Sequence, residues 1–347
     1  MLEPLLHLSL AFILSLGLGL YLTPRIRDGA LRFGVVDQPD GNLKTHARPV
    51  AYLGGIAIYL AFLITLALVF EFSPRLLGLL LGGTMVVMLG LFDDLKALGP
   101  GLKFIGQALA VGVLIKSGIG IHLVAIPTWA ALGLTVLWTV GITNAVNIID
   151  VSDGLAAGTA AISAIGLGII AVLNGDLLIA TTTFTLVGAL VGFLKYNQAP
   201  ASIYLGDAGS LFIGFMLAAL AAIGAYTGRT PWGMLAPLFL LALPILDTAL
   251  VSLARLRRGH SPFRGSPDHF ALRLKQRGWS SRKVALWAAG VQTLACAMGI
   301  GLVVVPAPVA MGLVITGAVG AAGLLAWWAS LGYGPSPDPV TEAASSP

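Results

Sequence analysis

The chain has 347 residues, of which 57% are hydrophobic and only 10% are charged, and its formal net charge is +5. A soluble domain usually carries about 25% charged residues, so this composition argues against a soluble protein. The basic residues lie mainly in short segments between apolar runs, which argues against a nucleic-acid partner. Cys296 is the only cysteine, which excludes an internal disulfide and a cysteine metal site.

Eleven apolar segments follow one another along the chain, most of them close to the length of a membrane-spanning helix. They lie near 3–22, 50–70, 76–92, 102–118, 127–146, 156–173, 177–194, 207–226, 232–254, 284–305 and 308–330. The first lacks a basic leading region and a small-residue cleavage site, so we expect an uncleaved span. The sequence therefore predicts an all-α, polytopic membrane helical bundle with about 11 transmembrane helices.

The distribution of Lys and Arg predicts the orientation of this bundle. With the N-terminus outside, 17 of the 20 basic residues fall on one side, and only Arg75, Lys116 and Arg229 fall on the other. The positive-inside rule makes the basic side cytoplasmic, and the C-terminus then lies there too. We expect one transmembrane domain over 1–333 and a disordered cytoplasmic tail over 334–347. The expected cytoplasmic loops are 23–49, 93–101, 147–155, 195–206 and 255–283.

Carboxylates gather at the cytoplasmic ends of the expected spans. They occur in four short motifs, GLFDDLK (90–96), NAVNIIDVSDG (144–154), YLGDAGS (204–210) and LPILD (243–247). An ionisable group at the bilayer boundary is costly and indicates a functional site. Mg²⁺ commonly binds one or two carboxylates together with substrate phosphates, and Lys and Arg neutralise the remaining phosphate charge. An acidic rim with basic loops therefore suits a metal that holds a phosphorylated substrate.

Each motif taken alone also has a structural interpretation. The Asp93–Asp94 pair could be a solvated helix cap, and Asp207 could be an N-cap before a long apolar helix. Asp247 could be structural, and the basic run over 255–283 could serve only to anchor the topology. The occurrence of four acidic motifs on one face favours the functional interpretation.

In their order and spacing, these motifs resemble those of the polyprenyl-phosphate N-acetylhexosamine-1-phosphate transferases, in glycosyltransferase family 4. The resemblance covers roughly 20–285 and includes KTHARPVAYLGGIAI (44–58), GLFDDLKALGPGLKFIGQ (90–107) and YLGDAGSLFIGF (204–215). The sequence is most similar to the bacterial undecaprenyl-phosphate GlcNAc-1-phosphate transferase branch, and more distantly to phospho-N-acetylmuramoyl-pentapeptide transferase.

The resemblance implies an Mg²⁺-dependent membrane enzyme whose site faces the cytoplasm of a multi-pass cell-membrane protein. It would transfer HexNAc-1-phosphate, by default GlcNAc-1-phosphate, from a UDP-sugar to polyprenyl phosphate and release UMP. This is the first membrane step of cell-envelope polysaccharide synthesis. Mn²⁺ could substitute for Mg²⁺. The lipid bilayer is an implied partner, and a homodimer is also compatible with the resemblance.

The family motifs assign roles to individual positions by resemblance. Asp207 matches a magnesium ligand, and Asp93 and Asp94 match a pair placed near the metal and the lipid phosphate. These three are the expected catalytic residues, with Asp207 and Asp93 holding the metal. The expected substrate-binding residues are Lys44, Arg48, Lys96, Asn144, Asn147, Asp150, Asp153, His269 and Arg273.

One departure from the family pattern lies in the last large loop, where relatives often have a histidine-rich H-x-H-H-R cluster. Here the stretch is DHFALRL (268–274), so only His269 and Arg273 remain, with Ala271 and Leu272 at histidine positions. This change puts the sugar specificity and the rate in doubt.

Three other classes are alternatives. A CDP-alcohol phosphotransferase would need Arg where Gly158 stands, and an intramembrane aspartyl protease would need a further glycine in YLGD (204–207). A non-catalytic or transport protein that binds the polyprenyl-phosphate carrier is supported only by the reduced histidine cluster.

Overall fold

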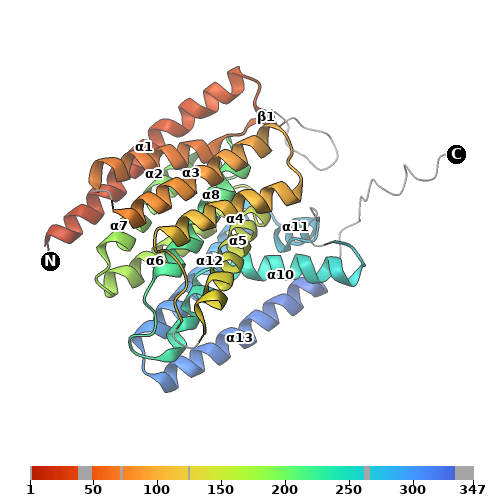
Figure 1. Cartoon of the computed structure of the whole chain (residues 1–347). Coiled ribbons are helices and arrows are strands. Elements are labelled where there is room, and N and C mark those ends of the chain that lie inside the picture. The colour runs from red at the N-terminus through yellow and green to blue at the C-terminus, as the bar shows by residue number, and fades with distance from the viewer. Residues whose placement is uncertain (1, 38–48, 71–72, 124–125, 262–265, 333–347) are drawn as a thin grey trace.

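The computed structural model describes residues 2–37, 49–70, 73–123, 126–261 and 266–332, which form a bundle of long helices (Figure 1). The expected tail over 334–347 and the candidate residues Lys44 and Arg48 lie outside this described part. The elements are α1 Leu2–Arg32, β1 Val36–Asp37, β2 Val50–Ala51, α2 Gly54–Val69, α3 Pro74–Leu95, α4 Pro100–Lys116, α5 Thr128–Ile148, α6 Leu155–Leu173, α7 Leu177–Asn197, α8 Gly206–Ile223, η1 Pro231–Leu235, α9 Ala236–Leu240, α10 Ala242–Arg257, α11 Phe270–Gln276, α12 Ser281–Val304 and α13 Ala307–Ser330.

The described fold is helical apart from one small antiparallel pair. In it Val36 is the partner of Ala51, and Asp37 is the partner of Val50. Ala51 also bridges to Ile203, just before α8. This pair therefore ties the connection after α1 to the chain that enters α8, at one end of the bundle.

Eight described helices are long and apolar enough to cross a membrane, and α9 with η1 and α10 form a ninth candidate that is bent by 71°. The remaining two of the eleven expected segments correspond to α2 and α4, which have 16 and 17 residues. Each expected apolar segment thus contains helix, although the segment 50–70 begins with the strand β2. The protein is a multi-pass membrane bundle, while the count of eleven crossings stays a prediction.

Helix α8 is the centre of the bundle. Of its apolar window 83% is buried, against 6% for α13, which lies at the periphery. Helices α3, α5, α2 and α6 pack around it. A Cβ on Gly90 of α3 would lie 2.5 Å from the backbone of Asp207 and Ala208. The glycine therefore lets α3 approach the first turn of α8 closely.

Two boundaries differ from the sequence-based loops. Helix α1 continues through Pro24 to Arg32, although the first loop was expected from residue 23. Arg25 and Arg27 are helical there, and the first span ends in a polar helical extension rather than at its first charges. Within the expected loop 255–283, residues Phe270–Gln276 form the short helix α11.

The break between α9 and α10 leaves backbone groups without helical partners, and one side chain satisfies them. Gln292 of α12 is fully buried, and its Nε2 donates to the Leu240 carbonyl at 2.7 Å. Its Oε1 accepts from the Leu243 backbone N–H at 3.0 Å. Because unsatisfied backbone groups are costly in a membrane, Gln292 stabilises the bend.

We expect Gln292→Leu to lower the free energy of unfolding by about 2–6 kcal/mol, since two buried backbone groups each lose a partner worth about 1–3 kcal/mol. Thermal unfolding of the detergent-solubilised protein measures this change. Thr293→Ala, at the exposed neighbouring position, is the control and should change little. Equal stability of the two variants would contradict this role for Gln292.

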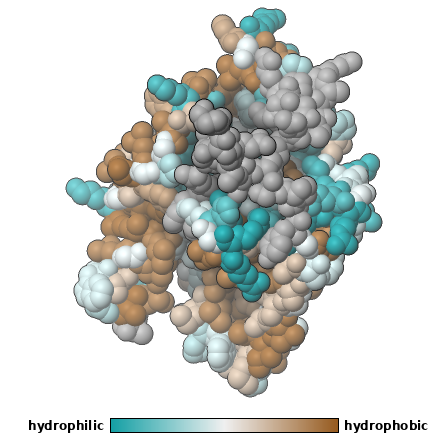
Figure 2. Space-filling view, turned by 90° about the vertical axis from the view of Figure 1, so that its right-hand side faces the viewer, coloured by the Kyte–Doolittle hydropathy of each residue, from teal (hydrophilic) through white to brown (hydrophobic). Residues whose placement is uncertain are grey.

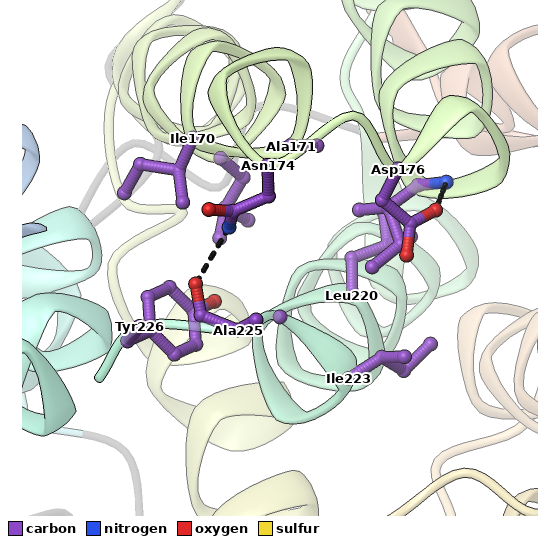
Figure 3. A pocket seen from close by; sticks show the side chains of 11 residues that line it. Ile170, Ala171, Asn174, Asp176, Leu220, Ile223, Ala225 and Tyr226 are labelled. Atoms are coloured by element: carbon purple, nitrogen blue, oxygen red, sulfur yellow. Dashed lines mark hydrogen bonds between the residues drawn. The ribbon is translucent and has the colours of Figure 1, made fainter. Parts of the chain in front are cut away.

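The end of the bundle that carries β1 and α11 has hydrophilic surface (Figure 2). Hydrophilic residues gather at the end near β1 and α11, while apolar surface runs along the flanks (Figure 2). At the opposite end, a small pocket lies between α6, α7 and the chain after α8 (Figure 3). Its polar groups are used within the fold, because Asn174 Nδ2 donates to the Ala225 carbonyl at 2.6 Å and Asp176 accepts from Ile179 N–H at 3.0 Å.

Candidate active site

The first turn of α8 presents Asp207 to two neighbouring helices. Its Oδ1 accepts from Asn147 Nδ2 of α5 at 2.7 Å, and its Oδ2 lies 3.1 Å from Lys103 Nζ of α4. Asn147 Nδ2 also contacts Ser210 Oγ at 2.8 Å, which fixes the amide. The Asp207 side chain is 32% exposed. The carboxylate is therefore held from two sides and open on another.

Lys103 joins two of the expected catalytic carboxylates. Its Nζ forms an ion pair with Asp93 Oδ2 as well as with Asp207 Oδ2. Asp93 is further fixed because its Oδ1 accepts from Leu98 N–H at 2.7 Å. Two aspartates that are far apart in the sequence thus converge on one cation.

Sequence reasoning had not assigned a role to Lys103. One signal was available, because Lys103 and Gln107 are four residues apart and are polar positions on the same face of an otherwise apolar helix. Gln107 is 1% exposed and its Oε1 accepts from Asn144 Nδ2 at 2.7 Å. This contact holds α4 against α5 one turn behind Asn147.

Asp94 faces away from Lys103 and binds the start of α8. Its two oxygens accept the backbone N–H groups of Asp207 at 2.7 Å and Ala208 at 3.1 Å. The N-terminal cap of α8 therefore comes from α3, and Asp207 is not itself the cap. Gly206 has φ +73°, and a Cβ there would lie 2.8 Å from Asp94 Oδ2. Both features require glycine.

The turn between α5 and α6 carries two more carboxylates. Asp153 Oδ2 accepts from Ala201 N–H at 3.1 Å, which ties this turn to the connection before α8. Asp150 is half-buried and faces the negative charges of Asp207 and Asp94. Burial, together with these charges, raises the pKa of Asp150 to about 7. Asp150 thus lies near the Asp207 and Asp94 carboxylates.

We expect the stability of the metal-free protein to depend on pH through Asp150. Its ordinary pKa is 3.8, so above that value the unfolded chain loses this proton while the folded protein keeps it until about pH 7. Rising pH therefore destabilises the fold across this window. Asp150→Asn removes the effect, so its advantage in Tm over wild type should grow from pH 4 to pH 7 and then level off. A constant difference in Tm across this range would contradict the assignment.

Asp93 and Asp207 with Lys103 form what we call the carboxylate cluster. The hydrogen bonds of the remaining candidates go to other residues. His269 Nδ1 lies 2.8 Å from Asp247 Oδ2. Arg273 is 1% exposed, and its guanidinium donates to the Asp268 carbonyl at 2.9 Å and to the Trp328 carbonyl of α13 at 3.0 Å. Arg273 thus packs α11 against α13. Lys96, at the end of α3, is exposed.

The donor set of the cluster fits a divalent cation. Asp93 and Asp207 direct one oxygen each at the same point, where Lys103 Nζ lies. In the described part of the chain no third His, Cys, Asp or Glu joins them. Mg²⁺ commonly takes one or two carboxylates and fills its other positions with waters and substrate phosphates. Two converging carboxylates, of which Asp207 is partly exposed to solvent, match that preference.

The fold and site together describe a polytopic membrane protein with two converging aspartates and a lysine at one end of its helices. Residues 76–225 match the family model for glycosyl transferase family 4. A probable undecaprenyl-phosphate N-acetylglucosaminyl 1-phosphate transferase of Bacillus subtilis is 33% identical over 293 residues, which cover 82% of each chain. A decaprenyl-phosphate N-acetylglucosaminephosphotransferase of Mycolicibacterium smegmatis is 31% identical over 321 residues, which cover 82% of this chain and 79% of the relative.

A phospho-N-acetylmuramoyl-pentapeptide-transferase of Streptococcus thermophilus is 38% identical over 169 residues, 44% of this chain and 48% of the relative. The chain belongs to glycosyl transferase family 4. The resemblance predicted from the motifs is therefore confirmed. The matched segment runs from α3 to the end of α8 and contains the whole carboxylate cluster, whereas Asp247 and His269 follow it.

Proposed function

We propose that the protein transfers GlcNAc-1-phosphate from UDP-GlcNAc to a polyprenyl phosphate, undecaprenyl phosphate by preference, and releases UMP. The observation that carries this proposal is the convergence of Asp93, Asp207 and Lys103 within the family segment. The relatives named above add support, since their names combine a polyprenyl phosphate with an N-acetylglucosaminyl phosphate. The reaction would begin a cell-envelope polysaccharide on its membrane carrier.

In this reaction an oxygen of the lipid phosphate attacks the β-phosphorus of the nucleotide sugar. The bond between the β-phosphorus and the oxygen that bridges it to the α-phosphate breaks, and UMP leaves with that oxygen. A phosphate monoester has a second pKa of about 6, so the attacking group is already ionised near neutral pH. The protein therefore needs no strong general base, and its main task is to position and neutralise two anionic phosphates.

The carboxylate cluster is suited to position and neutralise these phosphates. Asp93 and Asp207 would hold Mg²⁺, or Mn²⁺ in its place, and the bound metal polarises the phosphates and neutralises their charge. Lys103 provides a further positive charge beside both carboxylates. Asn147 orients the Asp207 carboxylate through its 2.7 Å contact. In this proposal Asp94 positions Asp207 by capping α8, in place of the catalytic role inferred from its motif.

The other candidates surround this centre in the proposal. Asn144, Asp150 and Asp153, on and after the end of α5, would contact the nucleotide and diphosphate. Lys96, which is exposed at the end of α3, would also contact the phosphates. Lys44 and Arg48 keep their proposed phosphate-binding role from sequence alone.

Release of UMP by purified protein in detergent tests this function. UMP should appear only when UDP-GlcNAc, undecaprenyl phosphate and Mg²⁺ are all present, and chelation should stop it reversibly. A protein that binds the lipid phosphate but releases no UMP would be the carrier-binding alternative. Replacement of UDP-GlcNAc by other UDP-N-acetylhexosamines would define the sugar.

We propose that the N-terminus is outside, the C-terminus is cytoplasmic, and the site faces the cytoplasm. In a Cys296→Ala background, Gly228→Cys lies after α8 and Gln276→Cys lies at the end of α11, and both positions are exposed. In intact cells an impermeant thiol reagent should label the cysteine at 228 and reach that at 276 only after permeabilisation. The reverse pattern would overturn the orientation.

A further inference from the structure

Helix α10 carries a carboxylate that the cluster does not use. Asp247 is fully buried, and most of its neighbours along α10 are apolar. A buried charge is costly unless it is paired and hydrogen-bonded. The partners of Asp247 therefore indicate why it is there.

Both partners come from the start of α11. Asp247 Oδ2 lies 2.8 Å from His269 Nδ1, and Asp247 Oδ1 accepts from the Phe270 backbone N–H at 3.0 Å. The carboxylate thus holds the ring of His269 and the backbone next to it. A neutral histidine carries a proton on only one ring nitrogen, and the hydrogen bonds of the ring decide which one. A carboxylate at Nδ1 fixes a proton there.

The residue before His269 is fixed by separate contacts. Asp268 is fully buried and forms ion pairs with Arg258 and Arg273. Its Oδ2 also accepts from Ser266 Oγ at 2.6 Å. His269 is therefore held on both sides along the chain, and its side chain is 7% exposed. With Nδ1 engaged, Nε2 is the ring nitrogen that remains for a ligand.

We propose that Asp247 is a positioning residue that fixes the ring of His269 so that Nε2 is presented to the phosphates of the nucleotide sugar. This rests on the proposed function. Helix α10 packs against α5, whose end carries Asn147, and Asp247 joins α10 to the start of α11. The Asp247–His269 pair compensates for the reduced histidine cluster, because the one histidine that remains is rigidly oriented. Ala271, at a former histidine position, is fully buried.

The charge and the shape of Asp247 can be separated. Asp247→Asn keeps the size, and its Oδ1 can still accept from Phe270 N–H. Its Nδ2 is a donor, however, so it opposes a proton on Nδ1. Thr248→Val is the matched control, because the Thr248 hydroxyl is buried without a partner among the described residues.

The first experiment measures directly which ring nitrogen of His269 carries the proton. In protein labelled with ¹⁵N-histidine in nanodiscs, the His269 signals are those absent from His269→Ala; the chain has five histidines. We expect the proton on Nδ1 in wild type and in Thr248→Val, and its transfer to Nε2 in Asp247→Asn. Identical His269 spectra for wild type and Asp247→Asn would overturn the proposal. This arm does not depend on activity, so it remains decisive if the proposed function fails.

The second arm is a double-mutant cycle on kcat/KM for UDP-GlcNAc. We expect Asp247→Asn and His269→Ala each to lower kcat/KM by about tenfold or more, and the double variant to match His269→Ala alone. Fully additive losses would show that Asp247 acts on the fold and not through His269, which overturns the proposal. Absence of UMP release by wild type would instead overturn the proposed function.

Discussion

Asp207→Asn is expected to lower kcat by about 10²–10³-fold or more, the scale of losing one preorganised electrostatic contact in an active site. The substitution keeps the size of the side chain, but it removes the charge that lies 3.1 Å from Lys103 Nζ and that would hold the metal. Mg²⁺ affinity should weaken in parallel. Turnover by the purified, folded variant at saturating substrates measures the effect.

Asp176→Asn is the matched control for this prediction. Asp176 caps α7 at the opposite end of the bundle, and Asn is as good an N-cap as Asp. Its turnover should remain close to that of wild type. If Asp207→Asn were equally active while folded and stable, Asp207 could not be the metal-holding residue.

Lys103→Met has the second-largest expected effect. The side chain keeps its apolar length and loses its ion pairs with Asp93 and Asp207. A charge-assisted contact with the substrate phosphates contributes about 1.5–3 kcal/mol, so loss of the lysine charge predicts a fall in turnover of roughly 10- to 150-fold. The same change leaves two carboxylates without their shared cation, so the Tm of the variant should rise more on addition of Mg²⁺ than that of wild type.

Lys116→Met is the comparison, because Lys116 is exposed at the other end of the same helix. It should alter neither turnover nor the response of Tm to Mg²⁺. Near-normal turnover of Lys103→Met, with no added stabilisation by Mg²⁺, would show that the lysine serves only to anchor α4.

The sequence was sufficient to predict the helical bundle, because its apolar runs and polar interruptions are unusually clear. It was also sufficient to bring Asp93, Asn147 and Asp207 together as one site, since their motifs all fall at the same expected face. The exact ends of helices were less predictable. The first loop was expected from residue 23, but the helix continues through Pro24 to Arg32.

The partners of individual side chains required the structure. Asp93 and Asp94 are adjacent, yet successive residues of a helix point about 100° apart, so one meets Lys103 and the other meets the start of α8. Sequence motifs could not separate these roles. Arg273 was grouped with His269 on the same grounds, but its contact with the Trp328 carbonyl depends on how α13 packs.

Transfer of the sugar together with its phosphate is the central claim, and an isotope label tests it most directly. UDP-GlcNAc carrying ³²P only in the β-phosphate, the one bonded to the sugar, is incubated with the protein and undecaprenyl phosphate. We predict that the label moves into the lipid fraction with GlcNAc in a one-to-one ratio, and that the UMP released is unlabelled. Label that stays in a nucleoside diphosphate while GlcNAc enters the lipid, or that never leaves UDP-GlcNAc, would contradict phosphosugar transfer.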